Sequence, residues 1–140
     1  MQQDKKKQLI KLALEARKFS YAPYSDFRVG AALLAKDGRI YTGCNIENAS
    51  YGVTNCAERT AVFKAISEGA HDFEAIAIVG GSGEALPKDI AAPCGTCRQV
   101  LAEFCESSEF SILLGRGDLT WEEYELKDLL PLSFSGRNLK

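Results

Sequence analysis

Pro93-Cys94-Gly95-Thr96-Cys97 and, far upstream, Cys56-Ala57-Glu58 are the stretches from which the rest of this chain can be understood. Three cysteine thiolates can bind a zinc ion and leave its fourth position open, as in catalytic zinc sites, whereas structural sites use four ligands. A carboxylate that is not itself a ligand can then carry protons for the zinc-bound water. We therefore predict one zinc ion per subunit, bound by Cys56, Cys94 and Cys97, with Glu58 as the catalytic residue of a metal-assisted hydrolysis.

The spacing of these residues places both stretches at helix starts. Cys94 and Cys97 are three positions apart and therefore share one helix face. Cys56 and Glu58 are two apart, so their side chains can converge only in the first turn of a helix. We predict that Thr54 or Asn55 caps that helix. The partial positive charge of two helix N-termini favours thiolate over thiol.

Zinc with three thiolates carries a net negative charge, which weakens its effect on a bound water. A positive side chain nearby would compensate for that charge. Arg59, directly after Glu58, and Arg98, directly after Cys97, are the two candidates. We expect Arg59 to be the charge-compensating residue, through hydrogen bonds to the thiolates.

Hydrophobic periodicity and turn residues predict alternating helices and strands, and hence a layered α/β fold with a mixed sheet. Asp37-Gly38 is a hairpin signal, and Gly80-Gly81-Ser82-Gly83 is predicted to be a plain loop. The predicted helices cover 5–18, 56–67 and 94–104, with a short turn at 127–130, and the predicted strands cover 28–34, 39–46, 75–79 and 110–114.

Size and composition predict a single domain over residues 1–140. The net charge of −2, without a basic stripe, argues against a nucleic-acid polymer as partner. No long apolar run predicts a membrane span. Five cysteines without a secretory signal favour a reducing compartment, and hence a cytoplasmic location. Cys44 and Cys105 are expected to be small buried hydrophobes, and His71 a solvated residue outside the metal site.

At these residues the chain closely resembles the small cytidine deaminases of nucleoside salvage, from the first predicted helix to near the C-terminus. Zinc deaminases carry His-x-Glu followed by Pro-Cys-x-x-Cys, or a variant with three cysteines. This chain has the variant, with Cys56 in the place of the histidine. The resemblance implies a three-layer α/β/α cytidine-deaminase-like fold with a mixed central sheet of about five strands. It also implies a homotetramer whose active sites are shared between subunits.

Further segments carry the resemblance and imply the substrate contacts. Residues 24–32 resemble the stretch whose phenylalanine packs against the pyrimidine, and residues 43–48 resemble the ribose-binding stretch. The main chain near Ala57 and Cys94 is implied to fix the base. The substrate-binding residues implied in this way are Phe27, Asn45, Glu47, Tyr51, Ala57 and Phe134, with Tyr51 and Phe134 acting in the site of another subunit.

The expected reaction is hydrolytic deamination of cytidine and 2′-deoxycytidine, in which Glu58 passes a proton to N3 of the ring and then to the departing amine. Three alternatives remain at this point. A related deaminase could act on another aminopyrimidine such as blasticidin S. A structural zinc module would need Cys44 as its fourth ligand. A thiol redox protein would use Cys94 and Cys97, but it would leave Cys56 and Glu58 without a role.

Overall fold

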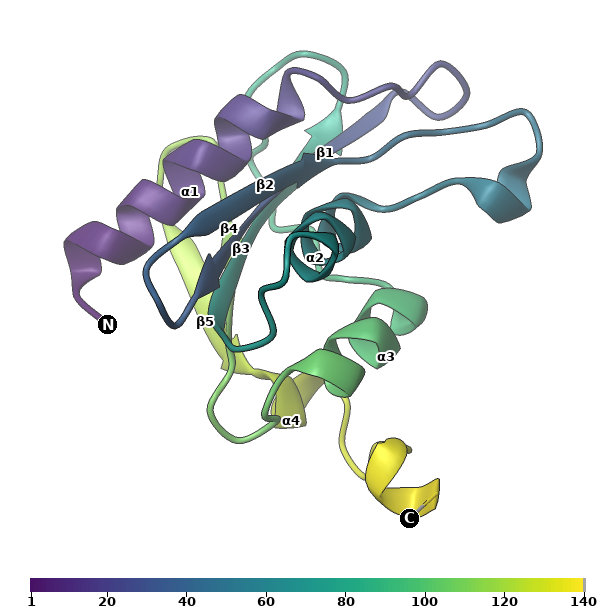
Figure 1. The fold of residues 1–140 in the computed structure, drawn as a ribbon. Coiled ribbons are helices and arrows are strands. Elements are labelled where there is room, and N and C mark those ends of the chain that lie inside the picture. Colours follow the sequence, from purple (N-terminus) through teal and green to yellow (C-terminus); the bar gives the residue numbers. More distant parts are fainter. Residues whose placement is uncertain (140) are drawn as a thin grey trace.

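The computed structural model describes residues 1–139, which form a five-stranded mixed sheet between layers of helices (Figure 1). The strand order is β2-β1-β3-β4-β5; β3 and β4 are parallel, and the other neighbours are antiparallel. The elements are α1 (Gln3–Arg17), β1 (Phe27–Ala35), β2 (Ile40–Cys44), η1 (Tyr51–Val53), α2 (Ala57–Ser67), β3 (Phe73–Ser82), α3 (Gly95–Phe104), β4 (Ser111–Gly115), β5 (Trp121–Glu125), α4 (Leu126–Leu129) and η2 (Gly136–Leu139). The last residue of the predicted domain, Lys140, lies outside the described residues.

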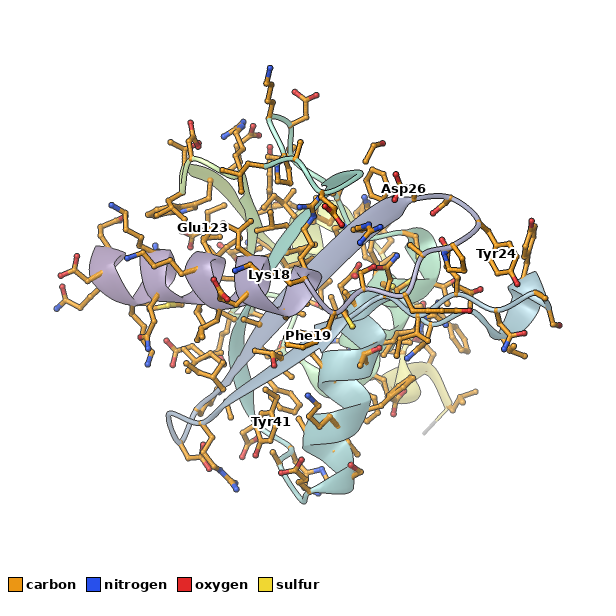
Figure 2. All side chains as sticks on the ribbon, turned by 90° about the horizontal axis from the view of Figure 1, so that it is seen from above. Lys18, Phe19, Tyr24, Asp26, Tyr41 and Glu123 are labelled. Atoms are coloured by element: carbon orange, nitrogen blue, oxygen red, sulfur yellow. The ribbon has the colours of Figure 1, made fainter. Side chains whose placement is uncertain are left out.

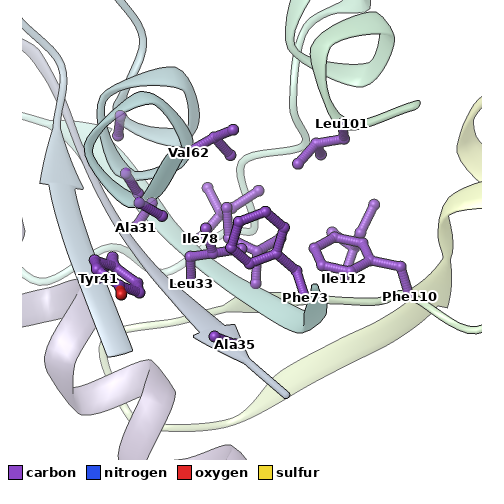
Figure 3. Close-up of a cluster of buried hydrophobic side chains, with 14 of the residues drawn as sticks. Ala31, Leu33, Ala35, Tyr41, Val62, Phe73, Ile78, Leu101, Phe110 and Ile112 are labelled. Atoms are coloured by element: carbon purple, nitrogen blue, oxygen red, sulfur yellow. The ribbon is translucent and has the colours of Figure 1, made fainter. Parts of the chain in front are cut away.

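Helix α1 covers one face of the sheet, and α2 and α3 cover the other, so the predicted three-layer fold is confirmed (Figure 1). Successive strand residues point to opposite faces. Toward α1 the central strands present mostly small side chains, whereas larger ones fill the layer beneath α2 and α3 (Figure 3). The α1 face includes Ala32, Ala75 and Ala77, and the other face includes Leu33, Ile76, Ile78, Phe110 and Ile112.

Two glycines allow the helices to rest directly on the strands. A Cβ atom at Gly30 in β1 would lie 1.9 Å from the carbonyl oxygen of Ala13 in α1. A Cβ atom at Gly43 in β2 would lie 2.6 Å from the main-chain nitrogen of Ala61 and 2.7 Å from the carbonyl oxygen of Ala57, both in α2. Any larger residue at either position would therefore push a helix main chain away from the sheet.

The predicted elements agree with most of the observed ones, and Gly38, with φ of 95°, forms the expected hairpin turn. Three details were wrong. Strand β3 continues to Ser82, because residues 80–82 pair with the start of β1 and are therefore not a loop. Strand β5 was not predicted, since Trp121–Glu125 contains mostly charged residues at an edge of the sheet. The residue that caps α2 is Cys56 itself, rather than Thr54 or Asn55.

None of the helices in residues 1–139 is both long enough and apolar enough to span a bilayer.

The close approach at Gly43 predicts that Gly43→Ala destabilises the protein by about 1–3 kcal/mol, because the added methyl group must displace the main chain of α2. Denaturant unfolding of the zinc-loaded protein measures this difference. The matched control is Gly136→Ala, where an added Cβ atom would meet no atom of the described residues within 4 Å. Equal free energies of unfolding for the two variants would contradict the packing argument.

Candidate metal centre and active site

The three predicted zinc ligands converge at the N-terminal ends of α2 and α3. Cys56 caps α2, Cys94 caps α3, and Cys97 lies in the first turn of α3. Their sulfur atoms all lie within 4.8 Å of one another. A tetrahedral zinc ion with Zn–S bonds of about 2.3 Å places its sulfurs roughly 3.8 Å apart, so the cluster fits zinc after only small side-chain movements.

Main-chain and side-chain donors surround the sulfurs. The Cys94 sulfur accepts a hydrogen bond from the main-chain N–H of Cys97 at 3.5 Å. The Arg59 guanidinium donates from Nη2 to the sulfur of Cys56 at 3.1 Å. Arg98 instead donates to the carbonyl oxygens of Pro93 and Leu129. Of the two candidate arginines, Arg59 is therefore the one that donates a hydrogen bond to a cysteine sulfur.

Three adjacent thiolates repel one another, and the pKa values of the cysteines reflect this. Hydrogen bonds from Cys97 and then Arg59 lower the pKa of Cys56. The hydrogen bond to Cys56, together with burial, raises the pKa of Cys97. A divalent cation that binds thiolates removes this conflict, because all three sulfurs can then ionise together. The donor set therefore fits zinc.

Glu58 lies in the first turn of α2 and is only 5% exposed. Burial, with a further contribution from the charge of Cys56, raises the pKa of Glu58 to about 7. A carboxyl group with this pKa can both accept and release a proton near neutral pH. Its position beside the sulfurs is what a proton carrier at this site requires.

A cleft of about 240 Å³ opens in front of the cluster. Four of the six predicted substrate-binding residues line it together with Cys56, Glu58 and Cys94, namely Phe27, Asn45, Glu47 and Ala57. Tyr51 lines an adjoining cleft of about 300 Å³ with Tyr24, and both clefts include Glu47. The two tyrosine rings meet edge to face at 5.8 Å between centroids. Phe134 lines neither cleft; it is 60% exposed.

Two polar residues of the cleft, Asn45 and Glu47, already form hydrogen bonds with neighbouring main chain. Asn45 accepts from the main-chain N–H of Val29 at 2.9 Å and from the hydroxyl of Ser20, and it donates to the carbonyl oxygen of Phe27 at 2.8 Å. Glu47 accepts from the main-chain N–H groups of Tyr24 and Ser25 and from the Ser25 hydroxyl, which lowers its pKa. Glu47 therefore carries a negative charge in the cleft.

Several lining residues were not singled out from the sequence. Ser25 and Val29 fall within the segment that resembles the base-contacting stretch, so their place could have been inferred from Phe27. Ala91 and Ala92 precede Pro93 and also line the cleft, where Ala91 lies near Phe27 and Val29 around Gly80. Their small apolar side chains carry no chemical signal, and only the folded structure reveals them.

The remaining cysteines and the histidine lie away from the cluster. Cys44 lines a separate cleft between α1 and α2, so it is not placed to be a fourth ligand. Cys105 is half-buried at the end of α3, and burial raises its pKa to about 12. His71 is exposed before β3.

Three sulfurs around a zinc site, with a buried carboxylate beside them in an open cleft, define the class of zinc-dependent deaminases. Residues 3–112 match the family model described as "Cytidine and deoxycytidylate deaminase zinc-binding region", and the chain belongs to this family. The resemblance found in the sequence is thereby confirmed. Membership of a zinc-binding family and the sulfur cluster together support one zinc ion per subunit.

The chain is similar to several cytidine deaminases. The enzyme of Halalkalibacterium halodurans is 51% identical over 94% of this chain and 95% of its own, and that of Sporosarcina psychrophila is 51% identical over 94% and 92%. The crystal structure of the cytidine deaminase from Burkholderia pseudomallei superposes with a TM-score of 0.84 at 43% identity, covering 96% of this chain and all of that one.

The geometry predicts that Cys94→Ala lowers the zinc content from about one ion per subunit to near zero, because two thiolates bind zinc far more weakly than three. Elemental analysis of the purified protein measures the stoichiometry. Cys44→Ala and His71→Ala are matched controls outside the cluster and should keep the wild-type zinc content. Loss of zinc in either control would contradict the all-cysteine site.

Proposed function

We propose that the chain is a zinc-dependent cytidine deaminase that converts cytidine and 2′-deoxycytidine to uridine and 2′-deoxyuridine with release of ammonia, in pyrimidine nucleoside salvage. The observation that carries the proposal is a single cleft in which buried Glu58 lies beside the three-sulfur cluster and the ring of Phe27 lines the same space. The names of the relatives, at 51% identity over nearly the whole chain, support the same reaction.

Bound to the three sulfurs, zinc supplies a water whose pKa is lowered. Glu58 takes a proton from the attacking water and delivers it to N3 of the cytosine ring, which makes C4 more electrophilic. The same carboxylate then takes the second proton of the water, from the hydroxyl group now attached to C4, and delivers it to the amine, which leaves as ammonia while the C4 carbonyl forms. A pKa of about 7 for Glu58, raised mainly by burial, suits a group that must accept and donate in one cycle.

The charges of the cleft favour a nucleoside over a nucleotide. Among the described residues that line the two adjoining clefts, the charged groups are the carboxylates Glu47 and Glu58 and the cysteine sulfurs. No lysine, arginine or histidine lines either cleft within residues 1–139. A 5′-phosphate would approach negative charge without a compensating cation, so deoxycytidylate, which the family also includes, is the weaker candidate.

The substrate contacts are proposed on the same basis. Phe27 offers an aromatic face to the base, and the main chain at Ala57 fixes its edge. One N–H of the Asn45 amide has no hydrogen-bond acceptor within residues 1–139, and the Glu47 carboxylate can accept further hydrogen bonds. The two side chains can therefore bind the hydroxyl groups of a sugar.

We further propose that the single domain of residues 1–140 acts in the cytoplasm as a homotetramer with shared active sites. Tyr51, Leu132 and Phe134 are 73%, 104% and 60% exposed, respectively. Large apolar side chains left in water favour burial against another subunit. Tyr51 and Phe134 would then complete the site of a neighbouring subunit.

The function is tested by the loss of ultraviolet absorbance when zinc-loaded protein is mixed with cytidine, 2′-deoxycytidine or deoxycytidylate. We expect turnover of both nucleosides, little turnover of the nucleotide, and loss of activity after chelation. Glu58→Gln is expected to keep zinc and fold while kcat falls by about 10²–10⁴-fold, the range typical of a lost general acid–base.

Glu68→Gln is the matched control, since Glu68 is an exposed carboxylate at the other end of the same helix. It should have wild-type kcat. A zinc-loaded wild-type protein that forms no uridine would overturn the proposed function, and a fully active Glu58→Gln variant would overturn the role of Glu58.

The contact between Arg59 and the sulfur of Cys56 predicts that Arg59→Gln lowers kcat by about tenfold or more, the scale of a hydrogen bond to a charged group. The pH–rate profile should also shift to higher pH, because the uncompensated thiolates place more negative charge near the reacting water. Arg59→Lys, which keeps the charge, should recover part of kcat. An unchanged kcat and pH profile for Arg59→Gln would refute charge compensation.

A further inference from the structure

Arg17, the last residue of α1, is a buried guanidinium held by main-chain carbonyl groups. It is 5% exposed. Its Nε donates to the carbonyl oxygen of Arg28 at 2.8 Å, and its Nη2 donates to those of Gly81 at 3.0 Å and Gly83 at 2.8 Å. Within residues 1–139 no carboxylate accepts a hydrogen bond from it. Burying a charge is unfavourable unless the charged group is paired and hydrogen-bonded. The carbonyl oxygens offset part of this cost for Arg17.

The three carbonyl groups lie directly behind the wall of the substrate cleft: Arg28 is between Phe27 and Val29, which both line the cleft, and β1 pairs there with the end of β3. Arg28 follows Phe27 at the start of β1, and Gly81 and Gly83 lie at the end of β3, where Phe27 pairs with Ser82. The ring of Phe27 packs over Gly80, since a Cβ atom there would lie 3.4 Å from Cε2 of the ring. Arg17 therefore joins the two strand ends that carry this ring.

The residue before Phe27 shows that this strand end is constrained. Asp26 has φ of 55°, in the left-handed region that non-glycine residues seldom adopt. Its main-chain N–H donates to Ala22 and its carbonyl oxygen accepts from Gly83. Figure 2 shows Lys18 and Phe19 at the end of α1, with Tyr24 on the loop that leads to Asp26. Such strain persists only where neighbouring contacts hold it.

The segment that follows α1 also contacts Asn45, a polar residue that lines the cleft. The Ser20 hydroxyl donates to Oδ1 of Asn45, which also accepts from the N–H of Val29, while Nδ2 of Asn45 donates to the carbonyl oxygen of Phe27. These bonds fix the orientation of the Asn45 amide, so that a donor N–H remains for a ligand. Arg17 and Asn45 thus hold the chain on both sides of Arg28.

We propose that Arg17, assisted by Ser20, is a positioning residue for substrate binding, which acts by holding Phe27 and Asn45 in the cleft wall. The proposal rests on the proposed deaminase function. Arg17 does not touch the zinc ligands or Glu58, which lie on the opposite wall at the starts of α2 and α3. Loss of Arg17 should therefore weaken binding of the nucleoside more than it slows the chemical step.

The test compares KM and kcat for cytidine in zinc-loaded Arg17→Gln, Arg17→Lys and Ser20→Ala. For Arg17→Gln we expect KM to rise by about three- to tenfold, the effect of one weakened hydrogen bond or stacking contact. The kcat value should stay within about twofold and the zinc content should be unchanged. Arg17→Lys, which keeps the positive charge, should have a KM between those of the wild type and Arg17→Gln. Ser20→Ala is the milder change and should raise KM while the protein remains folded.

Lys18→Gln is the matched control, because it removes a positive charge at the same helix end from an exposed side chain whose one ion-pair partner within residues 1–139 is Glu15. Its KM should equal that of the wild type. A purely stabilising role for Arg17 would lower the unfolding temperature and leave the KM of the folded variant unchanged, and that result would overturn the proposal. An unchanged KM for Ser20→Ala together with a fall in kcat alone would do the same.

Hydrogen exchange separates this proposal from the proposed function. The main-chain amides of residues 27–30 should exchange faster in Arg17→Gln than in Lys18→Gln, whatever the substrate. A wild-type protein that forms no uridine would overturn the deaminase function. It would also overturn the claim that Arg17 aids binding of the nucleoside. If the wild-type protein is active but residues 27–30 exchange equally fast in Arg17→Gln and Lys18→Gln, the positioning role of Arg17 is overturned and the deaminase function is not.

Discussion

The mutual repulsion of three cysteine sulfurs is the constraint around which this molecule is organised. They lie within 4.8 Å of one another, on two helices that are separated by a strand in the sequence. Such a cluster is stable only where positive charge meets it. The structure supplies that charge through the N-terminal ends of α2 and α3, the N–H of Cys97 and the guanidinium of Arg59, and a bound zinc ion supplies the rest.

Two helix ends can meet at one point only if the sheet beneath them is positioned accurately. The parallel pair β3 and β4 directs the chain so that α3 returns to the same face as α2. The close contact of α2 with β2 at Gly43 then leaves the start of α2 little freedom to move. Burial of Glu58 follows from this packing, because the first turn of α2 lies against the core. The raised pKa of Glu58 is thus a consequence of the packing of α2 against the sheet.

The sulfur cluster and the carboxylate beside it were easier to predict from the sequence than the wall of the cleft. Cysteine spacing and the position of Glu58 carry strong chemical information, since few arrangements explain them together. Most helices and strands followed from hydrophobic periodicity, whereas β5 was missed because its edge position permits charged residues. The family resemblance pointed to Phe27 and Asn45, but nothing in the sequence indicates that Arg17 supports them. An arginine at the end of an amphipathic helix is usually solvated. Its burial here depends on Gly30 of β1, where a Cβ atom would lie 2.6 Å from the main-chain nitrogen of Arg17.

The β1–β2 hairpin connects the two halves of the site. Its register pairs Gly30 with Cys44 and Ala31 with Gly43, so the close contacts of α1 and α2 occur side by side on opposite faces of the same hairpin. Helix α1, through Gly30 and Arg17, fixes the wall that carries Phe27. Helix α2, through Gly43, fixes Cys56 and Glu58. Because both helices pack on one pair of strands, strand pairing sets the separation between the ring of Phe27 and the carboxyl group of Glu58. The loops around the cleft lie outside this strand pairing, so a change in their sequence should leave that separation unchanged.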